Sequence, residues 1–341
     1  MQQANGAVRA ARRIPGWLGP AIVYGISIGC LWWVYHGFDW KSELPRLARI
    51  HWAWIAIAVA CDVLVYVSQG WRWNCLLTPI AKVPLGRSVK AIYIGLFANE
   101  VLPFRSGEVI RCYLQARWSH LPLPVVLSSA LIERLIDGVV LIGSFALMTA
   151  LLPNVPDVLE AGALTLAALV FAIGALVVFA VLNKRFAHHV TTRHRWSEAL
   201  RTLVEGLHAM GRSRSFLVAV GASLVYLLLQ LVPVYAMIRG YGLDQLSLAD
   251  AAIVLVVLRL STVVPGLPGN LGLFNAAAYL ALHRMLGLDP NTARSLSAVM
   301  FFIITVPLLL AGWIALAWTG LELKDVWRKA REHSAAHGRF R

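Results

Sequence analysis

Charged side chains are scarce in this chain, and acidic ones are scarcer still. Only 14% of its 341 residues are charged, with 17 Asp and Glu against 31 Lys and Arg. A soluble domain carries roughly 25% charged residues, so this scarcity excludes an ordinary soluble globular protein. Hydrophobic residues make up 59% of the sequence. Six apolar runs are long enough to cross a bilayer: residues 17–35, 52–77, 123–152, 158–182, 216–238 and 295–318. The sequence therefore predicts an all-α polytopic membrane protein.

Cysteines and catalytic motifs are also few. The sequence contains no P-loop, no H-E-x-x-H, no G-x-S-x-G and no phosphatase-type set of basic and histidine motifs, which argues against ATP-driven and covalent chemistry. The four cysteines are isolated, with no spacing typical of a metal site: Cys30, Cys61, Cys75 and Cys112. We therefore expect no enzymatic activity, no cofactor and no bound metal.

The net charge of +14 is carried by basic clusters between the apolar runs. Positive residues beside membrane spans mark the cytoplasmic side, so we expect these clusters to set topology and not to bind nucleic acid. They lie at the N-terminus, at the end of the second run with Arg72 and after it, between residues 184 and 214, and in the C-terminal tail. The first run lacks a small-residue cleavage site and is expected to be a retained span. Both termini are predicted to be cytoplasmic, in the inner membrane of a bacterium.

The domain limits follow from these clusters. Residues 1–16 are expected to form a cytoplasmic N-terminus, residues 17–320 a single transmembrane domain, and residues 321–341 a basic cytoplasmic tail. The domain divides into halves at about 17–152 and 158–320. Leu and Met at helical spacing over residues 195–211 predict an amphipathic helix that lies on the cytoplasmic leaflet.

Counting membrane crossings shows that two segments must enter and leave on one side. Residues 88–102 start in the cytoplasm, yet the next run, from residue 123, must also start there. In the second half, residues 249–285 must begin and end outside. The predicted fold is therefore six transmembrane helices plus two re-entrant helical hairpins in an inverted repeat, as in secondary transporters.

Each predicted hairpin contains a proline and glycine break. The pattern L-P-x-x-x-G occurs at residues 102–107 and again at 267–272, an offset of 165 residues. Backbone groups freed at membrane depth are tolerated only where they are buried in protein or line a wet cavity. The residues expected to make the breaks are Pro103, Gly107, Pro265, Gly266, Pro268, Gly269 and Gly272.

Charge collects at the first break. Arg105, Glu108 and Arg111 lie within seven positions of one another, and ionisable residues at membrane depth are costly to keep. Arginine presents a planar donor fork that suits phosphate, so Arg105 and Arg111 are candidates to hold an anion. The alternative is that both arginines pair with Glu108 or extend to the interface.

A second group of charges lies inside the run from residue 123. Glu133 and Asp137 are four residues apart and share one helical face, with Arg134 between them. These carboxylates form either a structural ion-pair network or a polar cavity wall that carries protons. Further polar residues suggest one cavity through the bundle: Asp62, Tyr66, Gln69, Tyr226, Gln230 and Arg259.

At these residues the sequence resembles the flippase-like lysylphosphatidylglycerol synthase transmembrane-region family. The resemblance rests on N-x-x-L-P-x-R-x-G-E-x-x-R from Asn99, on E-R-x-x-D from Glu133, and on P-G-L-P-G-N-L-G from Pro265. It covers essentially the whole chain. The chain departs from the family pattern at Asn270, where a glycine is common, and at Asn275, where many members carry a glutamate.

The resemblance implies lipid translocation and not lipid synthesis, because the chain ends soon after its last span without the soluble aminoacyl-transferase domain of the fused members. It implies a stand-alone member, similar to proteins linked to hopanoid biosynthesis. The expected substrate is an anionic or headgroup-bearing lipid: a phospholipid, a polyprenyl-phosphate-linked lipid or a hopanoid-type lipid. The alternatives are a membrane-embedded enzyme of lipid or glycolipid synthesis, and a non-transporting accessory subunit.

The candidate site combines these observations. Membrane lipid is the expected partner, while a second copy of the chain and enzymes of lipid biosynthesis stay open as protein partners. The residues expected to bind substrate are Gln69, Asn99, Arg105, Arg111 and Arg259. Those expected to balance charge or carry protons are Asp62, Glu108, Glu133 and Asp137.

Overall fold

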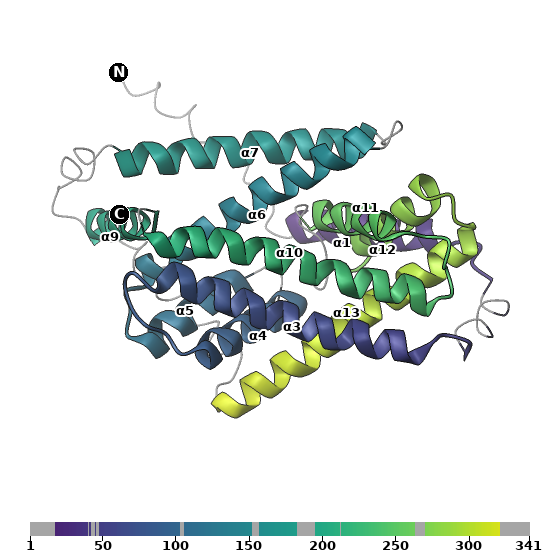
Figure 1. Ribbon diagram of the computed structural model, residues 1–341, viewed down its shortest axis with the longest axis horizontal. Helices are drawn as coiled ribbons and strands as arrows, with labels where there is room; N and C mark the ends of the chain where they lie inside the picture. The colour runs from purple at the N-terminus through teal and green to yellow at the C-terminus, as the bar shows by residue number, and fades with distance from the viewer. Residues whose placement is uncertain are drawn as a thin grey trace, which may run out of the picture.

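The computed structural model describes residues 18–39, 41, 45, 48–102, 106–151, 157–182, 195–211, 213–262 and 270–320. In these residues the secondary structure is helical, without strands. The helices are α1 Leu18–Tyr35, α3 Trp52–Leu77, α4 Leu85–Val101, α5 Gly107–Ser119, α6 Leu123–Leu151, α7 Asp157–Leu182, α9 Arg195–Gly211, α10 Arg214–Gly240, α11 Leu248–Ser261, α12 Leu273–Tyr279, which continues as π-helical turns over Leu280–Met285, and α13 Pro290–Thr319 (Figure 1).

Four of the described helices are long and apolar enough to cross a membrane: α3, α7, α10 and α13. At 1.5 Å per residue, a helix of 26 residues such as α3 extends about 39 Å, which exceeds the hydrocarbon core. The 29 residues of α6 include Glu133, Arg134 and Asp137 near the middle, a charge content unusual for a span. An all-helical, multi-pass membrane protein is confirmed, whereas six spans with two re-entrant hairpins stay a prediction.

Local chemistry sets several helix ends. Ser247 and Asp250 form a capping box at the start of α11, which satisfies amides that the first turn leaves unpaired. Asp289 accepts a hydrogen bond from the Thr292 amide and precedes Pro290 at the first position of α13. Gly320 ends α13 with φ of 62°, a left-handed conformation that glycine adopts without strain.

The central pair of helices is α3 and α10, which run antiparallel (Figure 1). Near the start of α3, the amide of His51 donates to the carbonyl of Gly240 at 3.0 Å. Near its end, Arg72 donates to Ser223 at 3.4 Å. Pro233 lies inside α10, where a proline removes one backbone hydrogen bond and bends the helix. These two helices line one side of the candidate site.

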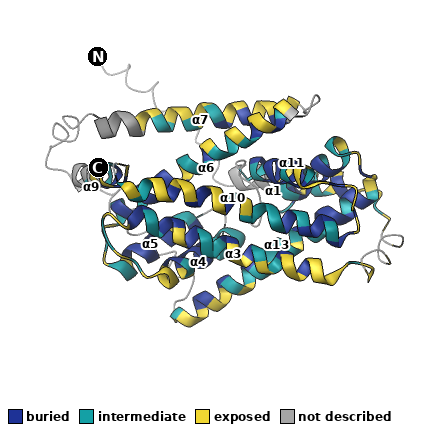
Figure 2. Ribbon diagram, in the orientation of Figure 1, coloured by how far each residue is buried: buried dark blue, intermediate teal, exposed yellow. Residues whose placement is uncertain are grey.

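The two broken segments lie toward opposite ends of the α3–α10 pair. One buried cluster surrounds α4 and α5 and includes Trp73, Ile92, Ile110 and Leu114. Another surrounds α11 and α12. Figure 2 shows exposed residues along much of α7, including Phe171 at 78% exposure. An outward apolar face of this kind fits contact with lipid tails.

The amphipathic helix α9 packs on the protein. Leu207 and Met210 are buried with Leu76 and Ile132 in one cluster. A Cβ atom added at Gly206 would lie 2.6 Å from the Ser128 hydroxyl oxygen, so α9 approaches α6 closely. Leu207 and Met210 therefore face α6 and its neighbours and not lipid, while the expectation that this helix lies on the cytoplasmic leaflet stays a prediction.

Candidate functional site

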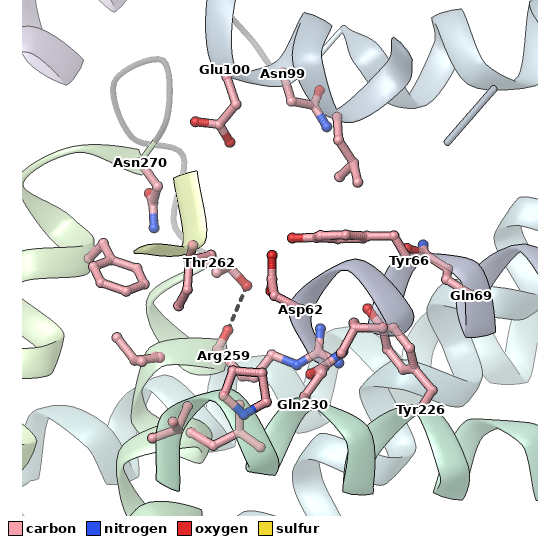
Figure 3. Close-up of a pocket in the computed structure, with 18 of the residues that line it drawn as sticks. Asp62, Tyr66, Gln69, Asn99, Glu100, Tyr226, Gln230, Arg259, Thr262 and Asn270 are labelled. Atoms are coloured by element: carbon pink, nitrogen blue, oxygen red, sulfur yellow. Dashed lines mark hydrogen bonds between the residues drawn. The ribbon is translucent and has the colours of Figure 1, made fainter. Parts of the chain in front are cut away.

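A cavity of about 390 Å³ lies at the middle of α3 and α10 and between the two broken segments (Figure 3). Much of its apolar wall comes from α10, α11 and α13, including Pro233, Leu255 and Ile304. Its polar wall comes from several helices. α3 carries Asp62, Tyr66 and Gln69, the adjoining ends of α4 and α5 carry Asn99, Glu100 and Glu108, and α6 carries Arg134. α10 carries Tyr226 and Gln230, the end of α11 carries Arg259 and Thr262, and Asn270 lies just before α12. We call this space the cavity.

Two polar side chains in the cavity wall lack partners within the described residues. Asp62 is 6% exposed, and its Oδ2 atom accepts no hydrogen bond. Both side-chain polar atoms of Asn270 are also buried without a partner. Leaving a buried polar group unpaired costs about 1–3 kcal/mol, and more for a charged group. A molecule that offers hydrogen bonds to these atoms would therefore be stabilised in the cavity.

Arg259 is the cation of the cavity wall that has no carboxylate partner among the described residues. It lies in the last turn of α11, with its guanidinium carbon 5.3 Å from the centre of the Tyr226 ring. The guanidinium of Arg72 lies 4.5 Å from the centre of the same ring. A smaller pocket is also lined by Arg259 and Tyr226, together with Asp137.

An ion-pair network, composed of Arg72, Glu108, Arg111, Glu133, Arg134 and Asp137, connects α3, α5 and α6. Arg72 pairs with Glu133 at 2.6 Å and with Asp137 at 2.5 Å. Arg111 pairs with Glu108 at 2.8 Å and with Glu133 at 3.0 Å. Arg134 pairs with Glu108 at 3.0 Å and with Asp137 at 3.4 Å.

The network is electrically balanced, with three arginines and three carboxylates. Its centre is dry, because Arg72 and Glu133 are fully buried, and Gln69 adds a hydrogen bond to Glu133 at 3.0 Å. Glu108 and Arg134 form its outer edge and reach the cavity wall. Removing one partner from such a buried group leaves an uncompensated charge, so the network fixes α5 and α6 against α3.

The start of α5 is held tightly against α4. Asn99 accepts a hydrogen bond from the Gly107 amide at 2.8 Å. A Cβ atom added at Gly107 would overlap the Gly95 carbonyl oxygen, so no residue larger than glycine fits there. A Cβ at Gly95 would lie 2.7 Å from the Arg111 Cβ. The first break therefore places Asn99 and Glu108 at the cavity while leaving no space between its two helices.

The second break is shaped by Asn270 and Gly272, which have φ of 53° and 88°. Asparagine is among the few residues other than glycine that adopt the left-handed region readily, so the asparagine at position 270 keeps the backbone that a glycine would have. A Cβ added at Gly272 would overlap the Ser27 carbonyl oxygen of α1. Asn275 does not line the cavity; its side chain accepts a hydrogen bond from the Tyr35 hydroxyl at 2.9 Å.

Residues 17–312 match the protein family described as Lysylphosphatidylglycerol synthase TM region. The chain belongs to this family. The resemblance that the motifs predicted is thereby confirmed, and membership of the lysylphosphatidylglycerol synthase TM-region family places the chain among lipid-related, multi-pass membrane proteins. Neither the curated proteins nor the solved structures contain a match to it.

The structure divides the predicted site residues into two groups. Lining the cavity are Asp62, Gln69, Asn99, Glu108 and Arg259. Arg111, Glu133 and Asp137 belong to the ion-pair network, which is the alternative considered for Glu133 and Asp137. The roles of both groups in binding and coupling stay predictions. Outside the described residues lie Pro103, Arg105, Pro265, Gly266, Pro268 and Gly269.

Sequence reasoning missed three residues. Arg72 was grouped with the cytoplasmic topology residues, and its ion pairs were not predicted: its side chain is fully buried between Glu133 and Asp137. The available signal was its position inside an apolar run. Glu100 lines the cavity one position after the Asn99 motif residue. Asn270 was noted only as a departure from the family pattern, and that departure was the available signal.

Proposed function

We propose that this chain is a lipid flippase of the bacterial inner membrane, which moves an anionic or headgroup-bearing lipid through the cavity. The observation that carries this proposal is the cavity itself, a space of about 390 Å³ inside an apolar helical bundle, with polar and charged side chains on part of its wall. Both broken segments contribute to it, with Asn99 and Glu108 from one and Arg259 and Asn270 from the other. A lipid headgroup crossing a bilayer needs such polar contacts at membrane depth.

The proposal includes a topology of six spans and two re-entrant hairpins, related as an inverted repeat, with both termini in the cytoplasm. Its support is the pattern of packing. The antiparallel pair α3 and α10 takes corresponding places in the two halves, α4 packs on α13, and α11 packs on α6. Labelling of single introduced cysteines tests this, and access to positions near Pro153 from the cytoplasm alone contradicts it.

Arg259 is the residue proposed to hold the anionic part of the headgroup. Arg111 already pairs with Glu108 and Glu133, so an anion could bind there only if one of these pairs opened. Arg259 contacts a ring face and no carboxylate within the described part of the chain. Its guanidinium donors are therefore available to a phosphate.

A proteoliposome assay tests the proposal, with a fluorescent phospholipid whose outer-leaflet fraction is quenched by dithionite. A hydrogen bond to a charged group is worth about 1.5–3 kcal/mol, so Arg259→Gln should slow lipid movement about tenfold to hundredfold. The matched control is Arg284→Gln, because Arg284 is exposed and away from the cavity, and it should move lipid at the wild-type rate.

Two results would contradict the proposal. Wild-type protein that moves no lipid above the rate of empty liposomes argues against a flippase and favours an accessory role. Equal rates for Arg259→Gln and Arg284→Gln would remove Arg259 from the site. A new lipid product formed by the protein in detergent would instead support the enzymatic alternative.

A further inference from the structure

The cavity presents charge of both signs at separate places. Asp62 is on α3 and Arg259 is on α11, and no ion pair joins them in the described structure. Figure 3 shows the Asp62 carboxylate pointing into the open centre of the cavity, toward the side where Glu100 and Asn270 lie. The Arg259 side chain extends beneath it toward Tyr226. A ligand in this space therefore meets a negative charge and a positive charge at different points.

Asp62 places a carboxylate in the same cavity as Arg259. Glu108 and Arg134 belong to the balanced ion-pair network, so they add no net charge. Asp62 and Arg259 line the cavity outside this network. A purely anionic ligand would gain from Arg259 but would lie close to the Asp62 carboxylate, and juxtaposed like charges disfavour binding.

The unpaired atoms define what the ligand must supply. Asp62 Oδ2 and Asn270 Oδ1 are acceptors that lack donors, while Asn270 Nδ2 is a donor that lacks an acceptor. In its ionised form Asp62 accepts hydrogen bonds and donates none, so the headgroup part that binds this form is a hydroxyl or an ammonium. The group that faces Arg259 must be an anion.

We propose that the cavity selects lipids whose headgroup combines an anion with a hydrogen-bond donor, and that Asp62 is the residue that sets this specificity. The anion binds Arg259, the hydroxyl or ammonium donor binds Asp62, and Asn270 contacts either part. A lipid that ends in a bare phosphate monoester is disfavoured above the second pKa of the phosphate, about 6, because its dianion leaves Asp62 without a donor and brings two negative charges near it. This inference rests on the proposed function, since it concerns the same cavity.

Equilibrium binding in detergent tests the selectivity without requiring transport. The purified full chain is titrated with dioleoyl lipids that differ only in headgroup, and bound lipid is counted by native mass spectrometry. Phosphatidylglycerol offers hydroxyl donors, phosphatidylethanolamine offers an ammonium donor, and phosphatidic acid is the bare monoester. At least one of the first two should bind about tenfold more tightly than phosphatidic acid, and their order identifies the donor.

Variants assign the selectivity to a residue. Asp62→Asn keeps the shape and removes the charge, so it should bind phosphatidic acid more tightly and reduce the preference to about threefold or less. Asp157→Asn is the matched control, because Asp157 is exposed in the first turn of α7. Asn270→Gly keeps a backbone suited to φ of 53° and removes a side chain that can contact either part of the headgroup, so it should weaken binding of all three lipids and leave the preference in place. If Asp62→Asn is not monodisperse, the three affinities of the wild-type protein still test the selectivity.

Wild-type protein that binds phosphatidic acid as tightly as the other two lipids overturns the inference, and so does an Asp62→Asn variant with the full wild-type preference. The proposed function fails separately. Preference in detergent without lipid movement in proteoliposomes contradicts the flippase alone. Movement of all three lipids at equal rates, with equal affinities, contradicts the selectivity alone.

Discussion

Replacing Arg72 with methionine should destabilise the protein far more than any exposed arginine change. Methionine keeps much of the length of the side chain and removes the charge. Glu133 would keep its contact with Arg111 at 3.0 Å, while Asp137 would keep only Arg134 at 3.4 Å. Both carboxylates are buried or nearly so, with side chains 0% and 14% exposed, so neither can recover its lost partner from water.

The cost follows from this burial. Breaking a buried ion pair by removing one partner costs about 3–5 kcal/mol, because the other charge is left uncompensated. Arg239 provides a matched comparison, since it also pairs with an aspartate, Asp244, and lies over a tyrosine ring. That pair is exposed, at 26% and 80%, so Arg239→Met should cost about 1 kcal/mol or less.

Denaturant unfolding in mixed micelles, followed by tryptophan fluorescence, measures both free energies of unfolding. The double variant Arg72→Met with Glu133→Gln removes one charge of each sign and should recover part of the stability lost in Arg72→Met. Equal losses in the free energy of unfolding for Arg72→Met and Arg239→Met would refute the conclusion that the buried, balanced ion-pair network holds these helices together. A loss in the double variant larger than the sum of the two single losses would refute it as well.

Two further changes test the packing around the breaks. Gly107→Ala should destabilise the protein by about 3 kcal/mol or more in the same unfolding assay, because the new Cβ would overlap the Gly95 carbonyl. The control is Gly143→Ala, whose Cβ meets nothing within 4 Å and which should be neutral or stabilising. Asn275→Ala removes the acceptor of the Tyr35 hydroxyl and should lower stability by about 1 kcal/mol without changing lipid binding, so a large binding defect would contradict a structural role.

The sequence was sufficient for the class of protein and for one face of the site. The spacing of Glu133 and Asp137 places them on one side of α6, because residues four apart on a helix are neighbours, and both carboxylates do contact one arginine. That arginine, Arg72, lies 61 residues before Glu133. No local pattern identifies a partner at such a distance, because the pairing is decided when α3 and α6 pack together.

The amphipathic helix shows the same limit from the other direction. The spacing of Leu207 and Met210 correctly indicates one apolar face of α9, but periodicity does not say what covers that face. The small surface at Gly206 and Ser128 lets α9 approach α6, so protein and not lipid buries it. Likewise, the asparagine at position 270 could be noted as unusual, while its unpaired side chain became visible only with the cavity around it.

Tyr226 has a consequence for how this sequence can drift. One ring contacts Arg72 on the side of the buried network and Arg259 at the cavity. Loss of the ring removes a favourable contact from both guanidiniums at once, so a change of this tyrosine to an aliphatic residue affects the buried network and the cavity together. Positions 72, 226 and 259 are therefore energetically coupled, although 187 positions separate the first from the last.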